Sequence, residues 1–515
     1  MESPYPNMGD FLLLQGFSSD VALIESSGSR TYADLAAAVA VQSERLRTWD
    51  LPAGSRVALL GANSLFWVAS YLAVMRSGHT VVPFAPVLTP SDVTAKMEQV
   101  GCTALLVDER LARRFAAVVD ACARVQTSAE LRQAGPTPPP LAPAAAPTDA
   151  AVLVFTSGTT SRARAVQVGH DNLFANTASI VEYLELRRDD RMLVVLPFSY
   201  CFGASLLHSH LAVGGSLRLC ETQAFPETIV EGIADDHCTG FAGVPSSYQM
   251  LLRASSFGTT PLPSLRHLQQ AGGRLPAAQV ERVAAAQPHA RLFLMYGQTE
   301  ATARIAYLPP DQLLARPDSV GRAVPGVTLR ITDEHGVELP VGEVGEIRVR
   351  GANVTHGYWQ DPVASAEKFV DGELRTGDLG RLDHDGFLHV VDRRDDFIKS
   401  WGYRVSSHEV EDVALELPGV TAAAAVGRPD PEAGEAVVLF AALGPGSGLD
   451  EEGLARHLRG RLARHLVPHE IRLLDQLPLN QNGKVVKTAL RELARAEAPG
   501  APETSHGLGS GVRDA

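Results

Sequence analysis

The sequence predicts an α/β protein with a large N-terminal domain of mixed and parallel sheets with helices, and a small α+β C-terminal domain. Three observations support this prediction. In the first half, short apolar runs alternate with amphipathic segments, the pattern of βαβ units and a largely parallel sheet. Beyond residue 320 the pattern changes to short strands and turns, which indicates a β-rich subdomain. The last part of the 515-residue chain mixes short helices and strands, as expected for a separate small unit.

The first half contains the clearest elements. Three apolar runs bounded by Gly or Asp are typical of buried strands: Arg56–Leu60, Thr80–Phe84 and Thr103–Val107. The segments between them, Leu65–Arg76 and Thr89–Val100, are predicted helices. Thr89 is suited to cap the second of these, and Pro90 suits its first helical position.

The later parts of the chain set the domain boundaries. The Pro- and Ala-rich stretch Ala134–Pro147 is typical of an extended linker, and the apolar run Ala151–Phe155 then resumes a buried strand. In the β-rich subdomain we expect strands at Val327–Thr332, Glu346–Arg350 and Gly386–Val391. We expect the last ~120 residues to form a separate small unit that ends in a disordered tail over 496–515.

Composition excludes several classes of function. The formal net charge is −13, and an acidic surface repels phosphate backbones and anionic lipid, so we expect no nucleic-acid partner. No stretch approaches the ~20 apolar residues that cross a bilayer, and Met1–Asp10 lacks the basic residue of a signal peptide. The five cysteines are scattered without a CxxC pair, which fits a protein of the reducing cytoplasm.

A polar loop directly after the predicted strand Ala151–Phe155 is the first candidate for a functional site. It combines hydroxyl side chains, a glycine and a cation in Thr156, Ser157, Gly158, Thr159, Thr160 and Arg164. Hydroxyl groups and backbone N–H groups can surround a polyphosphate, and arginine adds positive charge. The loop does not match the GxxxxGK[ST] pattern of P-loop nucleotide hydrolases.

This loop resembles the phosphate-binding signature of the adenylate-forming superfamily, which includes acyl-CoA synthetases, peptide-synthetase adenylation domains and luciferases. The usual form is TSGTTGxPKG. Here Ser161, Ala163, Arg164 and Ala165 replace the usual Gly, Pro, Lys and Gly, and Arg164 keeps the positive charge. The resemblance implies that the loop binds ATP.

Further motifs of that superfamily follow in order. Tyr296-Gly297-Gln298-Thr299-Glu300 resembles YGxTE, which implies adenine stacking on Tyr296, an α-phosphate contact from Thr299 and Mg²⁺ binding by Glu300. The paired glycines Gly272 and Gly273 would lie beside the adenine and the acyl group. Arg375–Leu379 resembles the TGD motif, which implies that Asp378 accepts hydrogen bonds from the ribose hydroxyls.

The C-terminal motifs imply two half-reactions. The segment 392–404 resembles the hinge and first strands of the family's C-terminal domain, which implies an N-terminal domain over residues 1–394 and a mobile C-terminal domain over 395–495. By this resemblance Arg393 would reach ribose and phosphates, and Lys399 would serve the second step after the domain rotates. Pro478–Lys484 resembles the family's PxxxxGK loop, which makes Lys484 the adenylation lysine. Only five lysines occur in the chain, and a compact ammonium suits the bridge between a carboxylate and the α-phosphate.

The segment Leu196–Gly203 would shape the acid pocket. Peptide-synthetase domains for α-amino acids carry an Asp there, and this chain has none, which argues against an α-amino acid. Many acyl-CoA synthetases have His at the position of Tyr200. With Gln298 and the pocket residues Tyr200, Phe202, Gly203, Tyr248 and Gly272, the pattern predicts an aromatic or medium aliphatic carboxylate.

The resemblance therefore implies an AMP-forming ligase that uses ATP and Mg²⁺ to activate a small acid, with CoA as the expected acceptor. Two alternatives share these motifs. One is an acyl-AMP ligase that loads a carrier protein. The other is a diazotase, which activates nitrite as an AMP anhydride and transfers it to an aryl amine. A scaffold that only binds nucleotide is disfavoured, because Lys484, Glu300 and Asp378 are all present.

Overall fold

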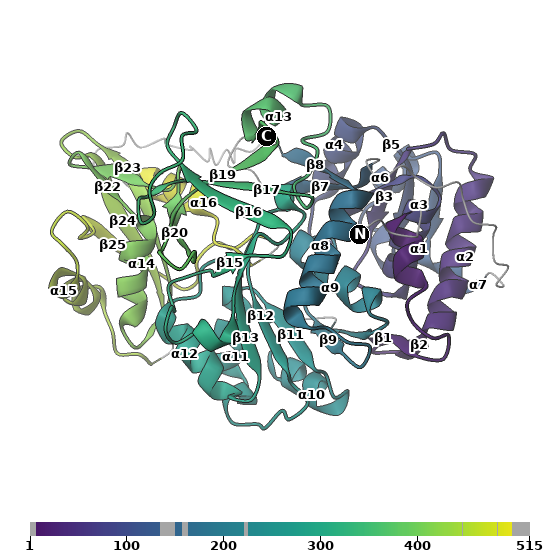
Figure 1. Ribbon diagram of the computed structural model, residues 1–515, viewed down its shortest axis with the longest axis horizontal. Coiled ribbons are helices and arrows are strands. Elements are labelled where there is room, and N and C mark those ends of the chain that lie inside the picture. The colour runs from purple at the N-terminus through teal and green to yellow at the C-terminus, as the bar shows by residue number, and fades with distance from the viewer. Residues whose placement is uncertain are drawn as a thin grey trace, which may run out of the picture. The chain divides into compact units, whose positions relative to one another are not determined.

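The computed structural model describes residues 7–133, 150–156, 163–220, 225–444, 446–480 and 483–496 (Figure 1). It divides into two compact units. The larger comprises the chain up to Val391 together with Asn480–Lys484, and the smaller comprises Asp392–Leu479 and the chain from Val485. Lys484 thus packs with the larger unit although its neighbours in sequence belong to the smaller one. The predicted linker and residues 497–515 of the predicted tail lie outside the described residues.

The first sheet of the larger unit contains the strands predicted from the first half of the sequence. Its order is β6-β5-β3-β4-β7-β8, and all neighbours are parallel except β7 and β8. The strands are β3 (Arg56–Leu60), β4 (Thr80–Phe84), β5 (Cys102–Val107), β6 (Val125–Thr127), β7 (Ala150–Thr156) and β8 (Arg164–Gly169). The three predicted strands are confirmed to within one residue at either end.

Helices cover both faces of this sheet. Val57 and Leu59 pack in the core that contains α3 (Leu65–Arg76), whereas Ala58 and Leu60 face the helices α4 (Pro90–Val100) and α6 (Ala116–Ala121). Thr89 caps α4 as predicted, in a reciprocal capping box with Asp92. The remaining helices of this region are α1 (Met8–Leu13), α2 (Tyr32–Thr48), α5 (Glu109–Ala112) and α7 (Ser128–Gln133).

The second sheet places the loops that matter for function. It has the order β15-β14-β13-β12-β11-β9-β10-β1-β2, with a parallel centre and antiparallel edges. The strands are β1 (Val21–Glu25), β2 (Gly28–Thr31), β9 (Arg191–Val194), β10 (Ser216–Leu219), β11 (Gly240–Gly243), β12 (His267–Gln270), β13 (Arg291–Tyr296), β14 (Ala306–Leu308) and β15 (Arg322–Ala323). Because β11, β12 and β13 run parallel, the loops that follow them leave the same edge of the sheet.

The helices of this half follow the same alternation. They are α8 (His170–Leu184), α9 (Cys201–Ala212), α10 (Glu227–Asp235), α11 (Pro245–Ala254) and α12 (Ala277–Ala286). Leucine, valine and aromatic side chains of α8 and α9 belong to one continuous core with both sheets. This packing fixes the first turn of α9, which carries part of the predicted acid pocket.

The β-rich subdomain forms an antiparallel sheet with order β16-β17-β19-β18, and β20 pairs with β19. Its elements are β16 (Val327–Thr332), β17 (Gly345–Gly351), α13 (Pro362–Lys368), β18 (Phe369–Val370), β19 (Glu373–Leu382) and β20 (Leu388–Arg393). The strand predicted from Gly386 begins instead at Leu388. Gly386 has φ +78°, and the Asp383 carboxylate accepts hydrogen bonds from the N–H groups of Asp385 and Phe387, so these residues close a turn.

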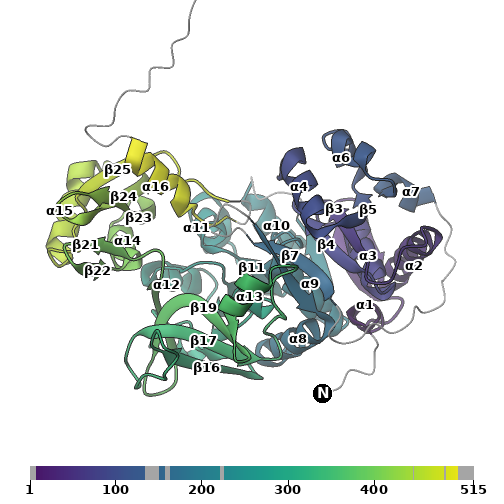
Figure 2. The same ribbon diagram turned by 90° about the horizontal axis from the view of Figure 1, so that it is seen from above.

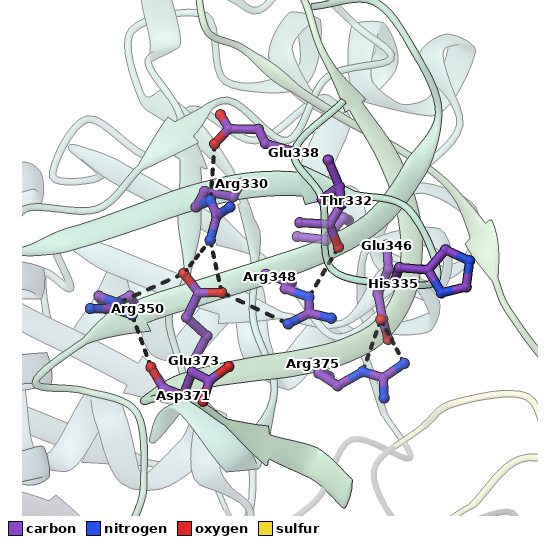
Figure 3. Close-up of polar contacts among 12 residues, drawn as sticks. Arg330, Thr332, His335, Glu338, Glu346, Arg348, Arg350, Asp371, Glu373 and Arg375 are labelled. Atoms are coloured by element: carbon purple, nitrogen blue, oxygen red, sulfur yellow. Dashed lines mark hydrogen bonds and ion pairs between the residues drawn. The ribbon is translucent and has the colours of Figure 1, made fainter. Parts of the chain in front are cut away.

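One face of this sheet carries a cluster of charges around Glu373 (Figure 3). Arg330 donates to both oxygens of this carboxylate at 3.0 and 3.2 Å, while nitrogens of Arg350 and Arg348 lie 3.7 and 4.0 Å from it. Arg330 and Arg348 are direct cross-strand neighbours. Like charges at such positions repel, so the buried carboxylate is the group that allows the three arginines to share one face.

The smaller unit is an α+β fold (Figure 2). Its sheet has the order β22-β21-β24-β23, with β25 parallel to β24. Helices α14 and α15 cover one face of the sheet and α16 covers the other. The elements are β21 (Ile398–Ser400), β22 (Tyr403–Val405), α14 (Ser407–Glu416), β23 (Val420–Asp430), β24 (Gly434–Leu443), α15 (Glu451–Arg461), β25 (Glu470–Leu474) and α16 (Lys487–Ala496).

The predicted fold class, an α/β protein with a large N-terminal domain, a β-rich subdomain and a small α+β C-terminal unit, is confirmed. In the part of the chain that the structure describes, no helix combines the length and the apolar character needed to span a bilayer.

Candidate active site

The predicted phosphate loop begins at the end of β7. Thr156 is the last residue of that strand, and its hydroxyl lies 3.5 Å from the carbonyl of Arg164, its partner at the start of β8. Ser157, Gly158, Thr159, Thr160 and Ser161 lie outside the described residues. The strands that flank the loop are thus paired in register, which fixes the position of its two ends.

Tyr296 and Asp378 meet across two sheets of the larger unit. Tyr296 ends β13, and its hydroxyl donates to a carboxylate oxygen of Asp378 at 2.5 Å. Asp378 is buried in β19, and its N–H donates to the Thr376 hydroxyl at 3.1 Å. The residues predicted to contact adenine and ribose therefore lie together, although 82 positions separate them in the sequence.

Thr299 and Glu300 stand on a single 3-10 turn, η2 (Thr299–Ala301), which Gly297 and Gln298 join to β13. The Thr299 hydroxyl lies 3.5 Å from the sulfur of Cys201, the first residue of α9. Burial raises the pKa of the Cys201 thiol, so it remains protonated at neutral pH. The buried Glu300 carboxylate accepts a 2.8 Å hydrogen bond from the hydroxyl of Tyr358.

The predicted Mg²⁺ ligand can be tested against this donor set. Across the described residues, no three or more His, Cys, Asp and Glu side chains are grouped so as to hold a metal ion. The Glu300 carboxylate accepts a hydrogen bond from Tyr358, whose ring faces Arg164 at the end of the predicted phosphate loop. Magnesium commonly takes one or two protein carboxylates and completes its shell with phosphate and water oxygens. The residues present therefore fit a cation delivered with a nucleotide.

Gly272, Tyr200 and Lys484 lie close together in the larger unit. Gly272 has φ +87°, and a Cβ placed on it would lie 3.1 Å from the Tyr200 hydroxyl and 3.5 Å from Cε of Lys484. The ammonium of Lys484 lies 5.6 Å from the centre of the Tyr200 ring, within the range of a cation–π contact. A side chain at position 272 would fill the space that these groups share, so glycine keeps this part of the site open.

The lysine loop is fastened to the larger unit by its backbone. The carbonyl of Gly483 accepts a 3.1 Å hydrogen bond from the Ser246 hydroxyl, at the start of α11. The N–H of Lys484 donates to the Asn480 side chain at 3.0 Å. These contacts place Lys484 beside the loop that follows β12, where Gly272 and Gly273 are found.

The other predicted pocket residues are buried, Phe202 and Gly203 in the first turn of α9 and Tyr248 in α11. Phe202 lies 4.3 Å beneath the guanidinium of Arg304. A Cβ on Gly203 would lie 2.1 Å from the carbonyl of Pro197, so this glycine permits close packing of the first helical turn. Tyr248 is fully buried and donates its hydroxyl to the carbonyl of Gln269 at 2.9 Å. A contact of Phe202, Gly203 or Tyr248 with the acid stays a prediction.

A small cavity of about 20 Å³, roughly enough for one water molecule, lies beside the start of α9. Its walls include Val154, Phe198, Cys201, Ala204 and His208. His208 shares a 2.9 Å hydrogen bond with the Tyr71 hydroxyl, and burial lowers its pKa to about 3, so the imidazole is neutral at physiological pH. This part of the molecule therefore presents an uncharged and mainly apolar lining.

Two predicted residues belong to the smaller unit. Arg393 ends β20, and its N–H donates to the Asp392 carboxylate at 2.8 Å. Lys399 is an exposed residue of β21, and its N–H donates to Glu435 at 2.7 Å. Their roles toward ribose and in the second half-reaction stay predictions.

The sequence reasoning missed Tyr358, which contacts both Glu300 and Arg164. It lies in the short sequence Gly357-Tyr358-Trp359 between β17 and α13, where no polar cluster marks a site. The only feature of the sequence that could have pointed to Tyr358 is the aromatic pair that directly follows Gly357. Pairing with β8 brings this segment to the site, and such non-local pairing is not visible in the linear sequence.

Comparisons with known proteins agree with this architecture. A family model described as AMP-binding enzyme matches residues 14–359, and a second model, described as AMP-binding enzyme C-terminal domain, matches residues 409–484. A feruloyl-CoA synthase from Amycolatopsis sp. is 31% identical over 90% of this chain and 93% of its own. An indoleacetate–CoA ligase from Aromatoleum aromaticum is 30% identical over the same shares. The structure of ATP-bound MatB from Rhodopseudomonas palustris superposes with a TM-score of 0.88 at 28% identity, covering 95% of this chain and 99% of that one.

Proposed function

The chain belongs to the AMP-binding enzyme family, and from this membership and the site geometry we propose that it joins an aromatic or medium aliphatic carboxylate to CoA through an acyl-AMP intermediate. It is an AMP-forming ligase of the acyl-CoA synthetase type. Its relatives named above are CoA ligases of small acids. We propose the class of the acid, CoA as the acceptor and the role of each residue.

The observation that carries the proposal is the position of Lys484. It lies in the same unit as Tyr296, Asp378 and Glu300, with its ammonium over Tyr200 and its chain beside Gly272. In the proposed first step, a carboxylate oxygen of the acid attacks the α-phosphorus of ATP, and the bond to the bridging oxygen of pyrophosphate breaks. Lys484 stabilises the negative charge shared by the carboxylate and the α-phosphate as the new bond forms.

The other residues orient the nucleotide. Tyr296 offers a ring to the adenine, Asp378 accepts from the ribose hydroxyls, and Thr299 donates to the α-phosphate. Glu300 would hold Mg²⁺ together with the phosphates, and the cation would supply positive charge that compensates the leaving pyrophosphate. In the second step the CoA thiol attacks the carbonyl carbon and AMP leaves with the carboxylate oxygen, a step for which we propose Lys399 in the smaller unit.

The surroundings of the start of α9 favour an acid with an uncharged body. The cavity walls are mainly apolar and the nearby histidine is neutral. The segment 196–203 holds no carboxylate that would pair with an ammonium group. A flat or medium-length apolar acid suits such a surface better than an amino acid does.

A panel of acids tests the proposed substrate class. Pyrophosphate release is measured with aryl, short and medium aliphatic acids, each with and without CoA, and with nitrite plus an aminobenzoate. We expect aryl or medium acids to give acid-dependent release, and CoA to accelerate turnover. An equal rate of pyrophosphate release with and without CoA would favour a carrier protein as acceptor. Pyrophosphate release that requires nitrite and no carboxylic acid would favour the diazotase.

Asp378→Asn tests the ribose contact. The substitution keeps the shape of the side chain and removes its charge, so the hydrogen bonds that it accepts weaken. We expect the KM for ATP to rise about tenfold, because one hydrogen bond to a charged group contributes about 1.5–3 kcal/mol. The KM for the acid should change far less. A KM for ATP equal to that of the wild type would remove Asp378 from the nucleotide site.

A further inference from the structure

We propose that Tyr358 is a positioning residue that fixes the Glu300 carboxylate through its hydroxyl and Arg164 through its ring, and so joins the cation-binding and phosphate-binding parts of the site. The inference rests on the proposed function, because it takes Glu300 as the carboxylate that meets Mg²⁺ and ATP.

Tyr358 contacts Glu300 through its hydroxyl group. The Tyr358 hydroxyl donates to Oε1 of Glu300 at 2.8 Å, and the two residues are 7% and 9% exposed. With one oxygen engaged by a rigid phenol, the carboxylate loses its rotational freedom before a cation arrives.

The backbone of Tyr358 is held as firmly as its hydroxyl. Tyr358 pairs with Val166 of β8, and the flanking N–H···O bonds between this segment and β8 measure 2.8 and 2.9 Å. Its own N–H donates to the Ser365 hydroxyl at 2.9 Å. Its ring meets the edge of Phe369, with centroids 5.8 Å apart. Tyr358, which donates to Glu300, is therefore held by its pairing with β8, by Ser365 and by Phe369.

Tyr358 contacts Arg164 through its aromatic ring. The guanidinium carbon lies 5.3 Å from the centre of the Tyr358 ring, within the range of a cation–π contact. Arg164 also faces Asp361 at 3.6 Å, but both side chains are about two-fifths exposed, so that pair contributes little. A planar guanidinium stacks on an aromatic face in a way that the ammonium of lysine does not. The ring of Tyr358 thus orients the arginine that stands where the family's usual signature has lysine.

Tyr358→Phe separates the hydroxyl from the ring. The dissociation constant for ATP is measured by calorimetry with excess Mg²⁺ and again in EDTA. We expect the variant to bind ATP about tenfold more weakly with Mg²⁺, since it loses one hydrogen bond to a charged group, and to match the wild type in EDTA. The free Mg²⁺ needed for half-maximal pyrophosphate release should rise in parallel. Tyr358→Leu, which also removes the ring, should weaken binding in EDTA as well.

Tyr32→Phe is the matched control. Tyr32 is also buried and donates its hydroxyl at 2.8 Å, to the carbonyl of Gly215. It should lose comparable stability while its ATP affinities stay unchanged. Wild-type affinity of Tyr358→Phe in both conditions, or an equal loss in both, would overturn the inference. A wild-type protein that binds no ATP in either condition would instead refute the proposed function.

Discussion

Replacing Lys484 with alanine is expected to lower acid-dependent pyrophosphate release about 10²-fold or more. The ammonium stabilises charge that develops on the carboxylate and the α-phosphate, and loss of one such donor raises a barrier by about 3 kcal/mol. The effect should fall on kcat rather than on the KM for ATP, because the contact strengthens in the transition state. Isotope exchange between pyrophosphate and ATP, with a saturating acid, measures this step alone.

Lys399→Ala is the matched control for that experiment. It removes a second lysine of the same chain, one that is exposed on β21 of the smaller unit. We expect Lys399→Ala to leave pyrophosphate exchange within about twofold of the wild type while it slows acyl-CoA formation. Full exchange activity in Lys484→Ala would show that the adenylation lysine has been wrongly assigned.

Glu373→Ala is expected to destabilise the larger unit by about 3 kcal/mol, the low end of the cost of breaking a buried charge pair, because Arg330 and Arg350 are partly exposed. The carboxylate is 4% exposed and faces Arg330, Arg348 and Arg350 (Figure 3). Its removal leaves three guanidinium groups on one sheet face without the carboxylate that they share, and Arg348 is itself buried. Urea unfolding at fixed temperature measures the loss.

Glu338→Ala provides the comparison for this cluster. Glu338 also pairs with Arg330, at 3.0 Å, but its side chain is 62% exposed. Exposed pairs contribute about 0–1 kcal/mol, so this variant should unfold close to the wild type. Both variants should retain the wild-type rate of adenylation while folded, since neither residue is proposed to contact substrate. Equal stability of the two variants would refute the account of the buried cluster.

Local patterns were sufficient to predict much of the fold. Arg56–Leu60 and Leu65–Arg76 coincide with β3 and α3 because an apolar run of strand length and a capped apolar segment each determine their own backbone. The boundary at Gly386 failed for a local reason as well. The Asp383 carboxylate holds the following N–H groups in a turn, and this competes with the strand.

The site was predictable only where a short motif carries its residues. Tyr296 and Asp378 each sit in such a motif, and the structure brings them within hydrogen-bond distance. Tyr358 carries no such mark, because its role depends on pairing with β8, almost 200 positions earlier in the chain. The return of Asn480–Lys484 to the larger unit depends in the same way on a distant partner, the Ser246 hydroxyl.

The most direct test of acyl-adenylate formation traces one carboxylate oxygen of the acid into AMP. An acid from the panel that turns over is labelled with ¹⁸O in its carboxylate and incubated with ATP, Mg²⁺ and CoA. Attack of the carboxylate on the α-phosphorus predicts that each AMP released carries one ¹⁸O, which mass spectrometry detects. Unlabelled AMP, or ADP in place of AMP, would contradict the formation of an acyl adenylate at this site.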